Sequence, residues 1–230
     1  MTTAVQDGMI WMNKTFGAQI DVGVKNTPIS KNLVIAIGIQ ETFYIWAKMY
    51  KTSMPEEVLG VCVGDTIDFP GRKTAWPKNR AELEKASNGK TMFKVARAAL
   101  ERIAKINSGY KAMAKKPDKF CHGFGMFQYD IQFFKEDPVY FLESQWATWD
   151  GTFKRGMSEL RNAVIGLYGP GKTNLSHDES VFVAIAYNRG VKGTKKDMAT
   201  KRFKQGHQDD NGVYYGERID QYLKAMKDLW

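Results

Sequence analysis

Apolar residues recur at helical spacing in several stretches of this 230-residue chain. From Lys31 to about Met49 almost every position is apolar, which predicts a largely buried helix with Ser30 as its N-cap. Residues 91–106 keep apolar side chains on one face and charged ones off it, so they predict an amphipathic helix. The first thirty residues show no such period and are expected to be irregular.

Proline, glycine and capping residues divide the second half of the chain. Pro138 is suited to the first position of a helix that runs to about Thr148. Ser176 and Glu179 form a capping-box pattern, and Gly190 is suited to end the helix that follows. Further helices are expected at 153–165, 181–187 and 217–229, with a Gly/Pro turn at 166–174 and a basic loop after 190.

The stretch between these helices is less regular. Residues 58–65 could be a short strand or a buried turn, residues 64–80 read as a structured loop, and Asn88-Gly89 is a break. The expected fold is mostly α, a single domain over 1–230, with a loop-rich insertion at about 51–119 that has room for short strands.

Composition excludes several protein classes. Hydrophobic residues make up 43% and charged residues 26%, which is ordinary globular usage and excludes a disordered chain, a fibre or a disulfide-rich miniprotein. The most apolar stretch, 33–39, is far shorter than the ~20 residues that a bilayer requires. The first residues lack a secretory pattern, so a signal is expected to be absent or already removed. Cys62 and Cys121 are expected to be thiols, although they could pair.

The 34 basic residues exceed the 25 acidic ones, giving a net charge of +9. Such a charge favours an anionic partner, which could be a nucleic acid, a membrane surface or a bacterial cell wall. Charge by itself does not choose among these partners, and it also serves solubility.

Glu41 is the most informative single residue. Its helical neighbours three and four positions away include Ile37, Tyr44 and Ile45, which offer little charge pairing. Desolvation by such neighbours would raise the pKa of this carboxyl, as a general acid near neutral pH requires. The alternative is an exposed glutamate near a helix end, or one paired with Lys48.

Two further segments carry candidate chemistry. In CHGFGMFQYD (121–130), glycines let the backbone approach another group closely, and a glutamine among apolar residues suits a sugar. In AIAYNRG (184–190), Asn188 could offer its amide to a ligand or could simply end the helix.

Taken in order, IQETF, GFGMFQYD and AYNRG, followed by an amphipathic helix, resemble the lysozyme-like lytic transglycosylases and goose-type lysozymes, the glycoside hydrolase family 23-like group. The resemblance covers about 31–50, 120–134 and 178–228. The middle segment is similar to the goose-type string Gly-Phe-Gly-Leu-Met-Gln-x-Asp.

The resemblance implies roles at matching positions. Glu41 would be the general acid that protonates a glycosidic oxygen. Asp130 matches an aspartate that positions water in goose-type enzymes, and Asp118 lies about one residue from the place of a second. Asp65 and Asp68 are outside candidates. The sugar site would be lined by Gly125, Met126, Phe127, Gln128, Tyr187 and Asn188.

The chain also departs from that family. Thr42 stands where the family has serine, and 87 residues separate Glu41 from Gln128, far more than is usual. A second carboxylate roughly 6.5–9.5 Å from Glu41, with room for water, would make an inverting hydrolase. Without one, the sugar's own groups would assist and a 1,6-anhydro product would form.

Peptidoglycan strands of an anionic cell wall are the expected partner and substrate, with cleavage of the β-1,4 link between N-acetylmuramic acid and N-acetylglucosamine. Chitin is the alternative glycan. No cofactor, metal or specific nucleic acid is expected, and a larger assembly or delivery system stays open. The site of action would be periplasmic or extracellular.

Two other classes of protein stay open. Residues 166–173 match the pattern G-x-x-x-x-G-K-[ST] of a phosphate-binding loop, which must follow a strand and open a helix at once. The segment before it reads as helical instead. Basic runs at 111–119 and 192–204 would also suit a nucleic-acid-binding protein, although no nucleic-acid-binding motif is present in the sequence.

Overall fold

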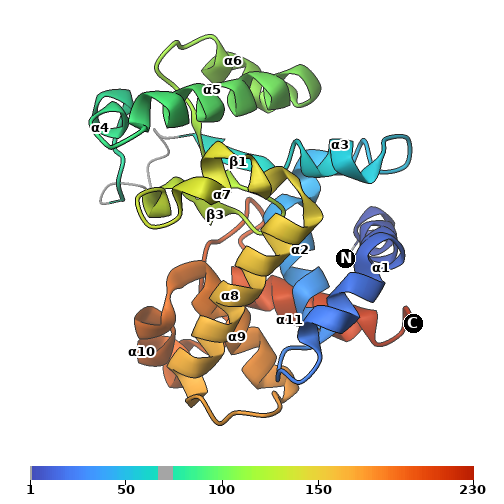
Figure 1. Ribbon diagram of the computed structural model, residues 1–230. Coiled ribbons are helices and arrows are strands. Elements are labelled where there is room, and N and C mark those ends of the chain that lie inside the picture. Colours follow the sequence, from blue (N-terminus) through green and yellow to red (C-terminus); the bar gives the residue numbers. More distant parts are fainter. Residues whose placement is uncertain (1, 67–74) are drawn as a thin grey trace. The chain divides into compact units, whose positions relative to one another are not determined.

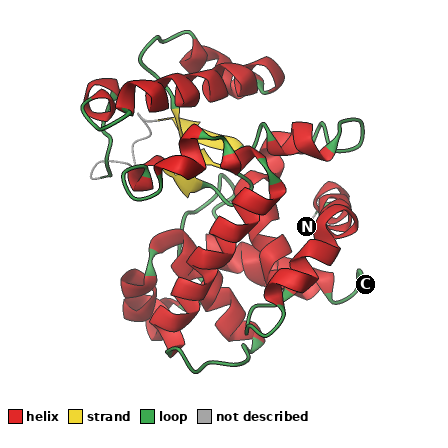
Figure 2. Ribbon diagram, viewed as in Figure 1, coloured by secondary structure: helices red, strands yellow, loops and turns green. Residues whose placement is uncertain are grey.

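A computed structural model describes residues 2–66 and 75–230. The structure is 64% helix and 5% strand, which confirms a mostly α fold with short strands (Figures 1 and 2). The chain divides into two compact units, each described by itself below. Unit 1 comprises residues 1–43 and 156–230, and unit 2 comprises residues 44–155.

Unit 1 begins with a long helix, α1 (Thr3–Val24), so the expectation of an irregular N-terminus was wrong. Met9, Met12, Phe16 and Ile20 recur every three or four residues and are buried. Glycines and β-branched residues between them lower helix propensity and obscure this period. Gly8 in fact favours packing, because a Cβ there would lie 2.5 Å from the Phe43 ring.

The second helix, α2 (Lys31–Trp46), matches the predicted buried helix and ends three residues earlier than expected. Ser30 caps it, since its Oγ accepts a hydrogen bond from the Leu33 N–H at 3.2 Å. Residues 33–39 are all buried. This helix therefore fixes Glu41 on a rigid, buried element.

Three helices close unit 1: α9 (His177–Arg189), α10 (Val191–Lys201) and α11 (Tyr215–Met226). The Ser176/Glu179 capping box and the Gly190 stop of α9 are confirmed. Helices α10 and α11 both pack on α9 (Figure 1). Helix α8 (Trp149–Tyr168), of which residues 156–168 belong to unit 1 and residues 149–155 to unit 2, is longer than the predicted 153–165.

The basic loop expected after Gly190 is instead helix α10. Thr194 and Asp197 on this helix are buried. Asp197 accepts hydrogen bonds at 2.9 Å from Arg189 on one side and Lys201 on the other. The Asp197–Lys201 pair spans one turn of α10 and stabilises this helix. The many lysines of the segment had suggested a loop instead.

Unit 2 contains a small antiparallel sheet of β1 (Val63–Thr66), β2 (Cys121–Phe124) and β3 (Tyr129–Asp130), in that order. Gly64 pairs with Gly123, and Gly123 pairs in turn with Asp130. The amphipathic helix α5 (Gly89–Ile106) packs against β1 and β2 and ends where the sequence predicted (Figure 1).

The other elements of unit 2 are short. Pro138 does begin a helix, but that helix stops at Leu142 because the chain then turns through Ser144, at φ +54°. The basic connector at 111–119 contains a brief helix. These elements are α3 (Pro55–Leu59), α4 (Arg80–Glu84), η2 (Ser108–Tyr110), α6 (Lys111–Ala114), η3 (Ile131–Phe133), α7 (Pro138–Leu142) and η4 (Gln145–Ala147).

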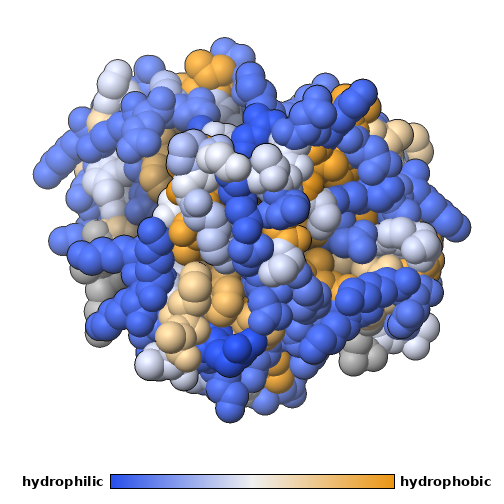
Figure 3. Space-filling model, turned by 90° about the horizontal axis from the view of Figure 1, so that it is seen from below, coloured by the Kyte–Doolittle hydropathy of each residue, from blue (hydrophilic) through white to orange (hydrophobic). Residues whose placement is uncertain are grey.

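Hydrophilic residues cover most of the face drawn in Figure 3, with apolar residues showing in places between them. Cys62 and Cys121 are buried thiols rather than halves of a disulfide. Among the described helices, none is both long and apolar enough to cross a membrane.

Candidate functional site

Glu41 lies near the end of α2 and is partly exposed. Its Oε1 accepts a hydrogen bond from the hydroxyl of Tyr215, the first residue of α11, at 2.7 Å. The next residue, Thr42, is fully buried, and its hydroxyl donates to the Gly38 carbonyl at 3.0 Å. The carboxyl is therefore held by a residue 174 positions away in the sequence, which sequence reasoning missed.

Tyr215 is anchored on several sides. The residue is 3% exposed, and its N–H donates to the His207 carbonyl at 2.8 Å. Gly206, at φ +86°, permits the close approach, because a Cβ there would lie 2.6 Å from the Tyr215 Cβ. Burial, with Glu41 and Tyr187 nearby, raises the pKa of Tyr215 well above its ordinary value. Tyr215 consequently stays a neutral hydrogen-bond donor throughout the neutral range.

The predicted residues Tyr187 and Asn188 lie at the end of α9 in the same unit. Tyr187 is near enough to Tyr215 to influence its titration. Asn188 is exposed, and its Oδ1 accepts a hydrogen bond from the His207 N–H at 3.3 Å. Asn188 therefore helps to hold the loop that carries Gly206 and leads to Tyr215.

The GFGMFQYD segment forms a hairpin between β2 and β3 in unit 2. Gly125 begins the turn at φ +82°, where a Cβ would lie 2.5 Å from the Thr152 hydroxyl. Gln128 ends the turn at φ +52°. Met126 and Phe127 between them are buried, with the Phe127 ring against Trp149. The structure thus gives this predicted sugar-binding pair a packing role in the core.

Gln128 folds back over the sheet. Its Nε2 donates to the Gly125 carbonyl at 2.9 Å and, more weakly, to the Cys62 carbonyl at 3.4 Å. A Cβ at Gly64 would lie 2.4 Å from Gln128 Oε1, and a Cβ at Gly123 would lie 2.3 Å from the same oxygen. The paired glycines of β1 and β2 therefore make room for the side chain of Gln128.

Asp130 belongs to a cluster with His122 and Asp65 in unit 2. Its Oδ2 lies 2.8 Å from His122 Nδ1, and its Oδ1 accepts the Gln132 N–H at 2.7 Å. His122 Nε2 lies 3.9 Å from an Asp65 carboxylate oxygen. Sequence reasoning did not assign a role to His122, because the cross-strand pairing that brings it to Asp130 is not a motif.

The other predicted carboxylates lie differently. Asp118 is 70% exposed and forms an ion pair with Arg80 at 3.1 Å. The Arg80 guanidinium lies over the Phe93 ring, 4.2 Å from its centroid. Asp118 is thus engaged in a surface pair, and Asp68 lies outside the described residues.

The match to a phosphate-binding loop lacks its required surroundings. The first three residues of this segment, 166–168, still belong to helix α8, and α9 begins only at His177, after Ser176. Lys172 pairs with Glu179 and lies over the Tyr168 ring, 5.2 Å from its centroid. The segment is an interhelical turn whose lysine contacts the next helix.

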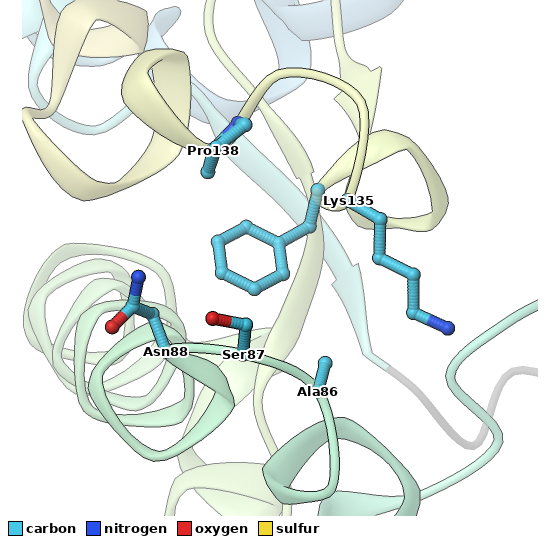
Figure 4. Close-up of a pocket in the computed structure, with 6 residues that line it drawn as sticks. Ala86, Ser87, Asn88, Lys135 and Pro138 are labelled. Carbon is cyan, nitrogen blue, oxygen red and sulfur yellow. The ribbon is translucent and has the colours of Figure 1, made fainter.

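A pocket of about 240 Å³ lies in unit 2 between residues 86–88 and 134–138 (Figure 4). Its lining is mostly apolar, with Ser87, Asn88 and Lys135 as polar members. None of the predicted site residues lines it. Across residues 2–66 and 75–230, no group of three or more His, Cys, Asp and Glu side chains is arranged to hold a metal ion.

No protein-family model, curated protein or solved structure matches the chain. Its chemistry is therefore inferred from two clusters of residues. The cluster in unit 1 is Glu41, Tyr215 and Tyr187, and the cluster in unit 2 is the β2–β3 hairpin with Gln128, Asp130 and His122.

Proposed function

We propose that this protein is a glycosidase that cleaves the β-1,4 link between N-acetylmuramic acid and N-acetylglucosamine in peptidoglycan, with Glu41 as general acid. The observation that carries the proposal is the Tyr215 hydrogen bond to Glu41 at 2.7 Å, near the end of a helix whose residues 33–39 are all buried. The ordered IQETF, GFGMFQYD and AYNRG segments add the resemblance to lysozyme-like enzymes.

The hydrogen bond assigns the two oxygens of the carboxyl different tasks. Oε1 accepts the hydrogen bond that the Tyr215 hydroxyl donates, so the proton that reaches the substrate is carried on Oε2. Because Tyr215 is anchored by burial and by the His207 carbonyl, the orientation of the carboxyl is set before substrate binds. Such preorganisation is what general acid catalysis needs from its surroundings.

The fate of the developing oxocarbenium-like centre separates two mechanisms. In a hydrolase, water adds to C1 and a second carboxylate takes its proton, a role that the resemblance to goose-type enzymes gives to Asp130. In a lytic transglycosylase, the C6 hydroxyl of the same sugar closes on C1, gives its proton to the carboxylate that Glu41 has become, and leaves a 1,6-anhydro end. Both oxygens of Asp130 already have partners, Oδ2 in His122 and Oδ1 in the Gln132 N–H, so the second route is kept as the alternative.

The substrate is proposed on charge as well as on chemistry. A chain with net charge +9 is attracted to the anionic polymers of a bacterial wall, and this attraction weakens as salt rises. Chitin shares the β-1,4 amino-sugar link but lacks the acidic groups. The protein would accordingly act in the periplasm or outside the cell, where the wall lies.

The proposal is tested by solubilisation of purified sacculi, followed as loss of turbidity. Glu41→Gln keeps the size of the side chain and removes the acid, so the rate should fall by about 100-fold or more. Glu143→Gln, at an exposed glutamate that follows α7, is the matched control and should keep the wild-type rate. A Glu41→Gln variant as active as Glu143→Gln would refute the proposed general acid.

The choice between the two mechanisms is made by running the reaction in ¹⁸O-labelled water. Hydrolysis places one labelled oxygen at each new reducing end, whereas transglycosylation places none and gives products that lack one water. Labelled products would exclude the transglycosylase, and unlabelled anhydro products would exclude Asp130 as a water-activating base.

A further inference from the structure

Tyr44 is the exposed member of an otherwise buried helical turn. Residues 42, 43, 45 and 46 of α2 are all buried, whereas Tyr44 is 55% exposed. It follows Glu41 by three positions on the same helix. A large aromatic ring that is open to solvent on a rigid helix is a ready surface for an apolar ligand face.

The Tyr44 ring is held by a residue from the segment that the lysozyme resemblance does not cover. Its hydroxyl lies 3.4 Å from the hydroxyl of Tyr110, the last residue of η2. The backbone of Asp65 also hydrogen-bonds Tyr110. Burial raises the pKa of Tyr110, against the hydrogen bond from Tyr44, so its phenol stays neutral at physiological pH.

Polar groups gather around the two phenols. A Cβ on Gly64 would lie 3.0 Å from the Tyr44 hydroxyl and 2.4 Å from Gln128 Oε1, so both oxygens lie over this glycine. The next residue, Asp65, has a carboxylate that is 54% exposed and a left-handed backbone at φ +48°. A non-glycine residue held in that region often marks a functional position.

We infer that Tyr44 and Tyr110 form a sugar-stacking subsite, with Asp65 at its rim, that binds an amino-sugar ring of the glycan. A pyranose ring presents an apolar C–H face and hydroxyl groups around its edge. The Tyr44 ring would contact the apolar C–H face of the sugar, and the hydroxyls of Tyr44 and Tyr110 with the Asp65 carboxylate would hydrogen-bond its hydroxyl groups. This inference rests on the proposed function, and it gives residues 51–119 a role in substrate binding through Tyr110.

The subsite is tested by calorimetric titration of the Glu41→Gln protein with an N-acetylglucosamine hexamer, which that variant would bind without cleaving. Adding Tyr44→Ala should weaken binding about 3- to 10-fold, the range expected for loss of one aromatic contact. Adding Tyr44→Phe keeps the ring and should weaken binding less. In the otherwise wild-type protein, Tyr44→Ala should raise KM on sacculi and leave kcat unchanged.

Trp230→Ala is the matched control, because Trp230 is an aromatic residue of similar exposure, 44%, with no proposed role. If the wild-type protein cleaves sacculi but Tyr44→Ala binds the hexamer as well as Trp230→Ala does, the subsite is refuted and the proposed function stands. If the wild-type protein cleaves no glycan, the proposed function fails and the subsite fails with it.

Discussion

The packing of Gln128 over paired glycines leads to a sharp prediction about stability. In Gly123→Ala the new Cβ would lie 2.3 Å from Gln128 Oε1, about 1 Å closer than side chains tolerate. The amide must move, and its 2.9 Å hydrogen bond to the Gly125 carbonyl is then lost. Losing that bond while leaving a polar group unpaired costs about 1–3 kcal/mol, against roughly 0.5–1 kcal/mol gained by replacing a strand glycine. The net loss is therefore between about 0 and 2.5 kcal/mol.

A double-mutant cycle isolates this contact. Gln128→Ala removes both the obstacle and the hydrogen bond, so adding Gly123→Ala to it should keep only the gain of roughly 0.5–1 kcal/mol from replacing a strand glycine. Urea denaturation of the four proteins should give a coupling free energy of about 1–3 kcal/mol, because the glycine gain cancels in the cycle. Gly171→Ala is the control, because its Cβ would meet no atom within 4 Å and should change stability by less than about 0.5 kcal/mol. Additive losses within about 0.5 kcal/mol would refute the proposed packing.

Three further predictions follow from single contacts. Tyr215→Phe removes the hydrogen bond to Glu41. Steady-state kinetics on sacculi should show kcat lowered about 10- to 100-fold with little change in KM. An unchanged kcat would contradict the positioning role of Tyr215. Hydrogen bonds from Lys201 and Arg189 lower the pKa of Asp197, so Asp197→Asn should have a lower melting temperature than the wild type at pH 7. The difference in melting temperature should narrow as pH falls below about 4, where the unfolded carboxyl takes up its proton. A difference that does not change with pH would contradict this assignment. Burial raises the pKa of the Cys121 thiol, so a thiol reagent should label Cys121 slowly in the native protein and rapidly in urea. Equal labelling rates in the native and the urea-unfolded protein would contradict the burial of this thiol.

Local signals in the sequence were sufficient to predict where several helices begin or end. Ser30, the Ser176/Glu179 capping box and Gly190 act through hydrogen bonds and backbone angles within a few residues, so their sequence context determines the outcome. The boundary at Asn88 was visible for the same reason, since asparagine tolerates its left-handed backbone at φ +57°.

Helices α1 and α10 were missed because tertiary contacts decide them. In α1, the glycines that weaken a helix also permit close packing, as the approach of Phe43 to Gly8 shows. In α10, a run of lysines looks like a solvated loop until Asp197 is seen to be buried between Arg189 and Lys201. Neither compensation can be read from composition or periodicity.

The candidate site was only half visible in the sequence. Glu41 could be selected because it is a lone carboxylate among apolar neighbours. Its partner Tyr215 could not be selected, because 174 residues separate the two and no motif connects them. Gln128 was selected from its motif as a sugar-binding residue, but the structure shows its amide donating to the backbone of its own hairpin, and this contact depends on how the turn folds.

The most direct test of Glu41 as a glycosidic acid is mass spectrometry of the soluble products released from purified peptidoglycan by the wild type and Glu41→Gln. The account predicts disaccharide-containing fragments, cut after N-acetylmuramic acid, from the wild type and at least about 100-fold less from the variant. Equal amounts of the same fragments from both proteins would contradict it.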